Sequence, residues 1–204
     1  DMASLDPRRY GSWITTEYSA RKNEECYDHV YILHHPDEER KACRPLRTAP
    51  CYDRMKANVD EYLDRIPARN SVTFIITYNN LSVTGLGALL EEIRQLRQKH
   101  SKTYQRVWFD IPLLRQPAWQ QVTFLPESYQ EIHQSNIEMM QKLSGPEEGY
   151  GAFRDFEIQK MQRNLAYWKK NADASAKNKK DFYAFFNEHD RRRTTRFLNT
   201  FPEM

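Results

Sequence analysis

Residues 71–78, which read Ser-Val-Thr-Phe-Ile-Ile-Thr-Tyr, decide the fold class of this chain. The run is β-branched and aromatic without a clean alternation of polar and apolar side chains, so it predicts a strand covered on both faces. A second apolar run, at residues 105–111, begins about 35 residues further on. This spacing fits a strand–helix–strand unit with a right-handed crossover, and it indicates an α/β fold with parallel strands.

Two amphipathic helices are expected, one on each side of the first strand in the sequence. The earlier helix lies between Pro50, a position that a first helical turn accepts, and Pro67, which follows its end. Its apolar stripe consists of Met55, Val59, Tyr62 and Leu63. The later helix ends near His100. Its apolar stripe consists of Leu86, Leu89, Leu90, Ile93 and Leu96.

The stretch at residues 7–50 lacks a steady hydrophobic period. It contains four prolines and two clusters of charged side chains. We therefore expect a long irregular insertion here. An alternative stays open, in which the first 50 residues supply strands to a self-contained α/β protein of another family.

The sequence after the second strand predicts one short strand and several helices. Residues 121–124 are expected to form the strand, and a long helix follows them. That helix carries Tyr129, Ile132, Ile137 and Met140 on one face. A break at Ser144-Gly-Pro precedes further helices over residues 153–201. We divide the chain into a β/α part at residues 1–142 and a helical C-terminal region at residues 143–204.

Composition limits the classes of protein to which the chain can belong. With 39% hydrophobic and 29% charged residues among 204, it is expected to be globular. The formal net charge of +3 is far below that of a dedicated nucleic-acid binder, so nucleic acid is not expected as a partner. No apolar run approaches the roughly 18 residues of a membrane-spanning helix. The absence of a targeting pattern predicts a cytoplasmic address.

A ligand site is expected where the two predicted strands end, because loops and helix N-termini converge at the carboxyl edge of a parallel sheet. Thr77 and Asn79 follow the first strand, and Asp110 ends the second. Their hydroxyl, amide and carboxylate groups suit a ribose or an amino-acid carboxylate. The alternative is that the asparagine makes an Asx-turn and the aspartate caps a loop.

Other polar and aromatic motifs favour structural roles. The pair His34–His35, followed by acidic residues, is interpreted as a solvated loop rather than a metal site, since adjacent side chains on an extended chain point in opposite directions. His189 beside Asp190 predicts a helix end. Arg191–Arg193 with Arg196 could contact phosphate, but a mixed solvated face or an intramolecular ion-pair network is favoured. The aromatic residues at 182–186 have helical spacing and are expected in the core. No metal ligand set and no catalytic nucleophile is recognised.

Three stretches resemble the radical S-adenosylmethionine (SAM) enzymes of the twitch-domain type. They are Ser71–Ser82, Ser101–Trp119 and Phe182–Met204. The resemblance implies a partial, TIM-like (β/α) barrel that binds SAM and a four-iron, four-sulfur cluster through a Cys-x-x-x-Cys-x-x-Cys loop. Cleavage of SAM in that family yields a radical that abstracts hydrogen from a substrate, here a peptide or small molecule of unknown identity.

The chain departs from this family in its cysteines. Cys26, Cys43 and Cys51 are too widely spaced to form the cluster loop, so the resemblance implies a C-terminal portion that is inactive alone. It also places Ser4 and Asp6 at the end of a fourth barrel strand. These two residues, together with Thr77, Asn79 and Asp110, would line the SAM site. The rival hypothesis is a non-catalytic α/β accessory module whose basic C-terminal tail contacts RNA or an acidic protein.

Overall fold

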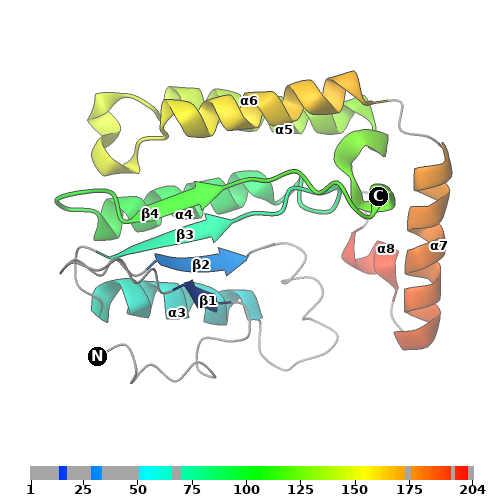
Figure 1. The fold of residues 1–204 in the computed structure, drawn as a ribbon, viewed down its shortest axis with the longest axis horizontal. Coiled ribbons are helices and arrows are strands. Elements are labelled where there is room, and N and C mark those ends of the chain that lie inside the picture. The colour runs from blue at the N-terminus through cyan, green and yellow to red at the C-terminus, as the bar shows by residue number, and fades with distance from the viewer. Residues whose placement is uncertain are drawn as a thin grey trace.

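The computed structural model describes residues 14–17, 29–33, 51–65, 70–172, 176–193 and 196–201. They form a mostly helical α/β structure around one four-stranded sheet (Figure 1). The strands, in sheet order, are β1 (Ile14–Glu17), β2 (His29–Leu33), β3 (Ser71–Ile75) and β4 (Val107–Asp110). Strand β1 is antiparallel to β2, whereas β2, β3 and β4 are mutually parallel. The predicted pair of parallel strands is therefore confirmed.

The first two strands correct the interpretation of residues 7–50 as an irregular insertion. Strand β2 pairs in parallel with β3, with Val30 opposite Val72. Both new strands have only four or five residues, and this length is too short for a period to emerge between charged segments. The other residues of 7–50 lie outside the described part. Among the described residues the sheet is open, so the partial barrel stays a prediction.

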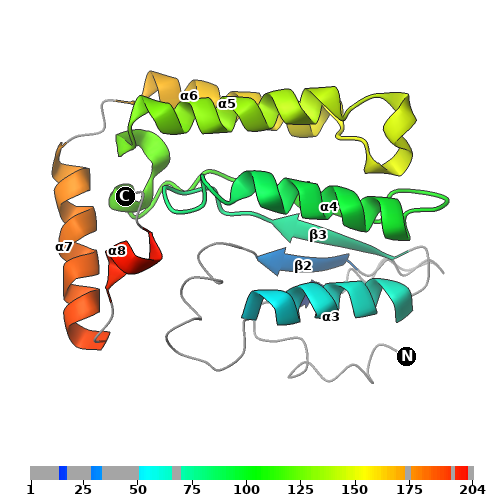
Figure 2. The ribbon, with the colours of Figure 1, turned by 180° about the vertical axis from the view of Figure 1, so that it is seen from behind.

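Helices α3 (Cys51–Arg65) and α4 (Leu86–His100) cover one face of the sheet, as Figure 2 shows from behind. Both helices match the predicted ranges, and the apolar stripe of α4 is buried. Burial alternates along the strands: Val72 and Phe74 are buried, whereas Thr73 and Ile75 are partly exposed. The expectation that β3 is covered on both faces is therefore wrong for the described residues. On the second face, Phe156 of helix α6 (Asp155–Lys170) stacks on Trp108 of β4, with ring centroids 6.3 Å apart.

Helices α5 (Glu127–Lys142) and α6 (Asp155–Lys170) pack together beyond β4 (Figure 1). Most of the predicted apolar face of α5 is buried, but Ile132 is 36% exposed. Three short 3-10 helices complete this part: η2 (Ala118–Gln120), η3 (Val122–Phe124) and η4 (Pro146–Gly151). The prediction of a strand at residues 121–124 is thus wrong. The backbone there bonds locally, with the Leu125 N–H donating to the Val122 carbonyl at 3.1 Å.

Helices α7 (Ala176–Arg193) and α8 (Phe197–Thr200) lie beyond the carboxyl ends of the strands (Figure 1). Their aromatic side chains form a second hydrophobic cluster with Leu81, and Phe182 is fully buried in it. Phe185, which is 46% exposed, departs from the core prediction. The arginine run behaves as expected, because hydrogen bonds from Arg191 and Arg192 lower the pKa of Glu188 to about 2. The boundary at residue 142 stays a prediction.

The described helices lack the features of membrane spans. None of them combines the length and the apolar character needed to cross a bilayer.

Candidate functional site

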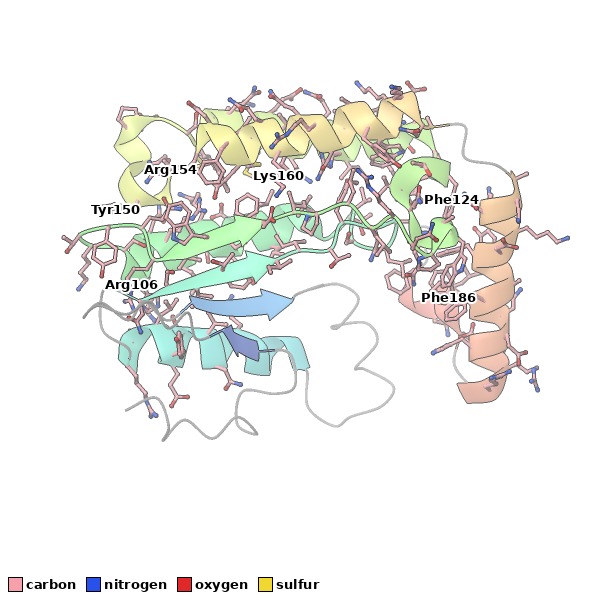
Figure 3. The ribbon with its side chains drawn as sticks, in the orientation of Figure 1. Arg106, Phe124, Tyr150, Arg154, Lys160 and Phe186 are labelled. Carbon is pink, nitrogen blue, oxygen red and sulfur yellow. The ribbon has the colours of Figure 1, made fainter. Side chains whose placement is uncertain are left out.

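The predicted ligand residues occupy different environments at the carboxyl edge of the sheet. Asp110 ends β4, and its carboxylate pairs with the ammonium group of Lys160 on α6. Figure 3 shows Lys160 extending from α6 toward the sheet. The same carboxylate accepts a hydrogen bond from the Ile111 N–H at 2.8 Å, so it also caps the loop. Burial and the neighbouring Arg163 lower the pKa of Lys160. Ser4 and Asp6 lie outside the described residues.

Asn79 makes the Asx-turn that the sequence allowed. Its side-chain oxygen accepts hydrogen bonds from the N–H groups of Leu81 and Ser82, at 2.8 and 3.2 Å. The side chain is buried and its acceptor is already used. Thr77 is partly exposed and follows Ile76, whose N–H donates to the Asp110 carbonyl at 2.8 Å. The structure therefore places Thr77 two residues beyond β3, next to the end of β4 at Asp110, while the Asn79 carboxamide bonds to the backbone.

Protein side chains fill the space behind this edge. The Tyr78 hydroxyl lies 2.6 Å from His133 Nδ1, and His133 Nε2 lies 2.9 Å from the Met161 carbonyl. A carbonyl can only accept, so Nε2 carries the proton and Nδ1 accepts from the hydroxyl. Both side chains are fully buried, and burial raises the pKa of Tyr78 and lowers that of His133. Two neutral groups with no exposed atom form a structural pair.

Sequence reasoning missed this pair and a second buried one. Arg97, on the buried side of α4, donates to Glu157 on α6 at 2.5 and 3.1 Å and to the Val107 carbonyl at 2.8 Å. Both charged side chains are 0% exposed. His133 was detectable as a polar residue on the apolar stripe of α5, four residues after Tyr129 and four before Ile137.

An open groove lies between α3 and α4, on the covered face of the sheet, and has a volume of about 400 Å³. Its lining residues are Lys56, Ala57, Asp60, Glu92, Gln95, Leu96 and Lys99. Two ion pairs bridge the helices: Lys56 Nζ lies 3.2 Å from Glu92 Oε1, and Lys99 Nζ lies 2.6 Å from Asp60 Oδ2. We call this feature the α3–α4 groove.

A small hollow in the core lies next to the α3–α4 groove. It shares Lys56, Glu92 and Leu96 with the groove. The other residues of that hollow are Val59, Phe74, Leu89 and Ile93. These four side chains are at most 2% exposed, so the accessible apolar lining of the groove is Ala57, the edge of Leu96 and the hydrocarbon stems of the lysines.

Contacts with Lys99 and His100 shift the pKa of Asp60 at the rim. Burial alone would raise the pKa of Asp60, but hydrogen bonds from Lys99 and His100 outweigh it, and the pKa falls below its ordinary value. The hydrogen bond to Asp60 raises the pKa of Lys99. Both groups are therefore charged near neutral pH. Within the described residues, no three side chains of the metal-ligating types come together as a metal site.

One family model and three relatives match parts of the chain. The model of the FAD dependent oxidoreductase central domain matches residues 1–49. Human mitochondrial dimethylglycine dehydrogenase is 43% identical over 58 residues, which are 28% of this chain and 7% of that enzyme. The mouse enzyme gives the same values, and the rat enzyme is 49% identical over 47 residues, or 23% of this chain and 6% of the enzyme. No solved structure matches.

These matches contradict the resemblance to radical SAM enzymes. They point to FAD-dependent oxidoreductases, so the expected SAM and iron–sulfur cofactors are wrong, and the accessory-module alternative gains no support. The resemblance rested mainly on residues 71–82, 101–119 and 182–204, whereas the family model covers residues 1–49. Buried strands and loop ends recur in many α/β folds, and such patterns do not fix a cofactor. The relatives are mitochondrial by name, and the cytoplasmic address stays a prediction.

The described residues do not fit FAD. A dinucleotide loop needs Gly-x-Gly-x-x-Gly between a strand and a helix, but the run at Gly85 and Gly87 has Leu90 in the third position. A Cβ atom at Gly87 would lie 2.7 Å from Asn136 Oδ1, so this glycine serves the packing of α4 against α5. Behind the carboxyl edge of the sheet, Tyr78 and His133 are fully buried and bonded to each other. We therefore assign no described residue to a flavin.

Proposed function

We propose that this chain is a segment of an FAD-dependent oxidoreductase that acts on dimethylglycine or a similar N-methylated amino acid. The identity of 43% over 58 residues with the human dehydrogenase carries the proposal. Strands β1 and β2 lie inside the range that the family model matches, so the matched part contributes two strands to the sheet. Helices α3 and α4, which follow the range that the family model matches, cover the sheet to which these strands belong.

A segment exchange tests this proposal. Residues 1–49 of this chain replace the aligned segment of human dimethylglycine dehydrogenase. We expect the chimera to retain its bound flavin and to reduce a dye in the presence of dimethylglycine, with kcat/KM within about tenfold of the parent, since equivalent segments preserve packing. The control chimera carries residues 101–149 in the same place.

The outcome separates folding from function. A chimera that melts cooperatively and holds flavin, yet shows no turnover with dimethylglycine, would overturn the proposal. A smaller exchange of residues 14–33 alone serves if the larger chimera does not fold. Loss of flavin from the folded smaller chimera would equally contradict a shared domain.

A further inference from the structure

The rim of the α3–α4 groove carries alternating charges. Lys56 and Asp60 lie one turn apart on α3, and each pairs with the opposite charge on α4, Glu92 or Lys99. Because the pairs run in opposite senses, the two cations are diagonal to one another, and so are the two carboxylates. A ligand with one positive and one negative group can contact both signs at once. A simple anion or cation would face repulsion from half of the rim.

The base, or floor, of the α3–α4 groove also favours a ligand with apolar groups. Ala57, the edge of Leu96 and the hydrocarbon stems of Lys56 and Lys99 line the base of the groove. A compact ligand that carries methyl groups next to its charged ends would cover this surface and remove apolar area from water. The groove volume of about 400 Å³ lies within the usual range of small-molecule sites, which is about 300–1,000 Å³.

Opening the rim to a ligand costs little free energy. The side chains of Lys56 and Lys99 are 47% and 55% exposed, and exposed ion pairs contribute about 0–1 kcal/mol. The lysines can therefore exchange a protein carboxylate for a ligand carboxylate without loss of the fold. The buried pair of Arg97 and Glu157 has no such freedom.

We infer that the α3–α4 groove binds a small zwitterion with apolar substituents, of the N-alkylated amino-acid class. In the bound state a lysine ammonium receives the ligand carboxylate, Glu92 or Asp60 receives the ligand ammonium, and the alkyl groups cover the apolar floor. The choice of N-methylated amino acids rests on the proposed function, whereas the charge pattern stands independently of it. The groove is then a binding site distinct from the flavin reaction.

Titration of the full chain with three matched probes tests the inference. Dimethylglycine carries both charges, 3-methylbutanoate replaces its nitrogen by carbon, and N,N-dimethylethylamine lacks the carboxylate. We expect millimolar binding of dimethylglycine, with NMR shifts at the amides of Ala57 and Gln95, and about tenfold weaker binding of either single-charge probe, since each loses one charge-assisted contact. Equal affinity for 3-methylbutanoate, or no shifts on α3 and α4, would overturn the inference.

Two variants and a control complete the experiment. Lys99→Met and Glu92→Gln should each weaken dimethylglycine binding by about tenfold, because each removes one charge from the rim. Glu188→Gln on α7, which also removes an ion-paired carboxylate, should leave binding unchanged. Unaltered affinity in both groove variants would refute the site. If dimethylglycine does not bind in the titration but the chimera is active, only the groove is rejected. If dimethylglycine binds but the chimera is inactive, only the proposed function is rejected.

Discussion

The carboxyl edge of the sheet and the α3–α4 groove use polar side chains in opposite ways. Behind the edge, Tyr78 and His133 are fully buried, neutral and bonded to each other. Along the groove, the bridging lysines are about half exposed and pair with carboxylates across open space. A buried polar group whose hydrogen bonds all go to other protein groups joins secondary-structure elements. A polar group that also contacts solvent can exchange a protein partner for a ligand. Position at a strand end is therefore a weaker guide to a ligand site than the availability of polar atoms.

The largest effect is expected from breaking the buried ion pair. Arg97→Met leaves the Glu157 carboxylate buried without its partner and removes the donor to the Val107 carbonyl. Such losses destabilise proteins by about 3–5 kcal/mol. Urea denaturation should show this decrease in the free energy of unfolding. The double variant Arg97→Met, Glu157→Leu should recover much of it, and a single variant as stable as the parent would contradict the buried position of the pair.

A smaller effect is expected from the tyrosine–histidine pair, and it depends on pH. The pKa of His133 is lowered in the folded state, so below its ordinary value of about 6.5 the unfolded chain binds more protons than the folded chain. The free energy of unfolding should therefore fall as pH decreases from 6.5 toward the folded pKa. At higher pH, where both states are neutral, His133 contributes no slope.

The measurement is chemical denaturation of the parent and of the double variant Tyr78→Phe, His133→Phe between about pH 5 and pH 8, the range in which histidine titrates. The double variant lacks both polar groups, so it should lose the part of the pH dependence of the free energy of unfolding that His133 causes. Removal of the hydroxyl alone, in Tyr78→Phe, leaves His133 Nδ1 without its donor and should cost about 1–3 kcal/mol near neutral pH. An unchanged slope in the double variant would show that other groups control acid stability.

These pairs also show where the sequence stops being informative. Periodicity predicted α3, α4, β3 and β4 with close boundaries, because each shows a buried stripe or a compact apolar run. The pairing of Tyr78 with His133 spans 55 residues, and that of Arg97 with Glu157 spans 60. No local pattern encodes a partner at such a distance. Strands β1 and β2 were missed because each has only four or five residues and lies between charged segments, although both are rich in β-branched or aromatic residues.

The candidate site was harder to predict than the fold. Asp110 and Thr77 were placed correctly at the strand ends, but sequence position could not show that Lys160 pairs with Asp110. The groove was missed because its lysines and carboxylates look like ordinary solvated faces of two separate helices. Only the packing of α3 beside α4 brings these charges to one rim. A site assembled from two helix surfaces leaves no motif in either helix.

The smallest effect is expected at the open rim, where Lys56 pairs with Glu92. A double-mutant cycle with Lys56→Ala and Glu92→Ala should give a coupling energy below about 1 kcal/mol, because solvent screens the pair and both side chains lose rotamer freedom to form it. The coupling should weaken further when salt is added, whereas the effect of Arg97→Met should not change with salt. A coupling above about 2 kcal/mol would mean that the rim stabilises the fold as strongly as the buried pairs do. The α3–α4 groove would then lack the exchangeable charges that ligand binding needs.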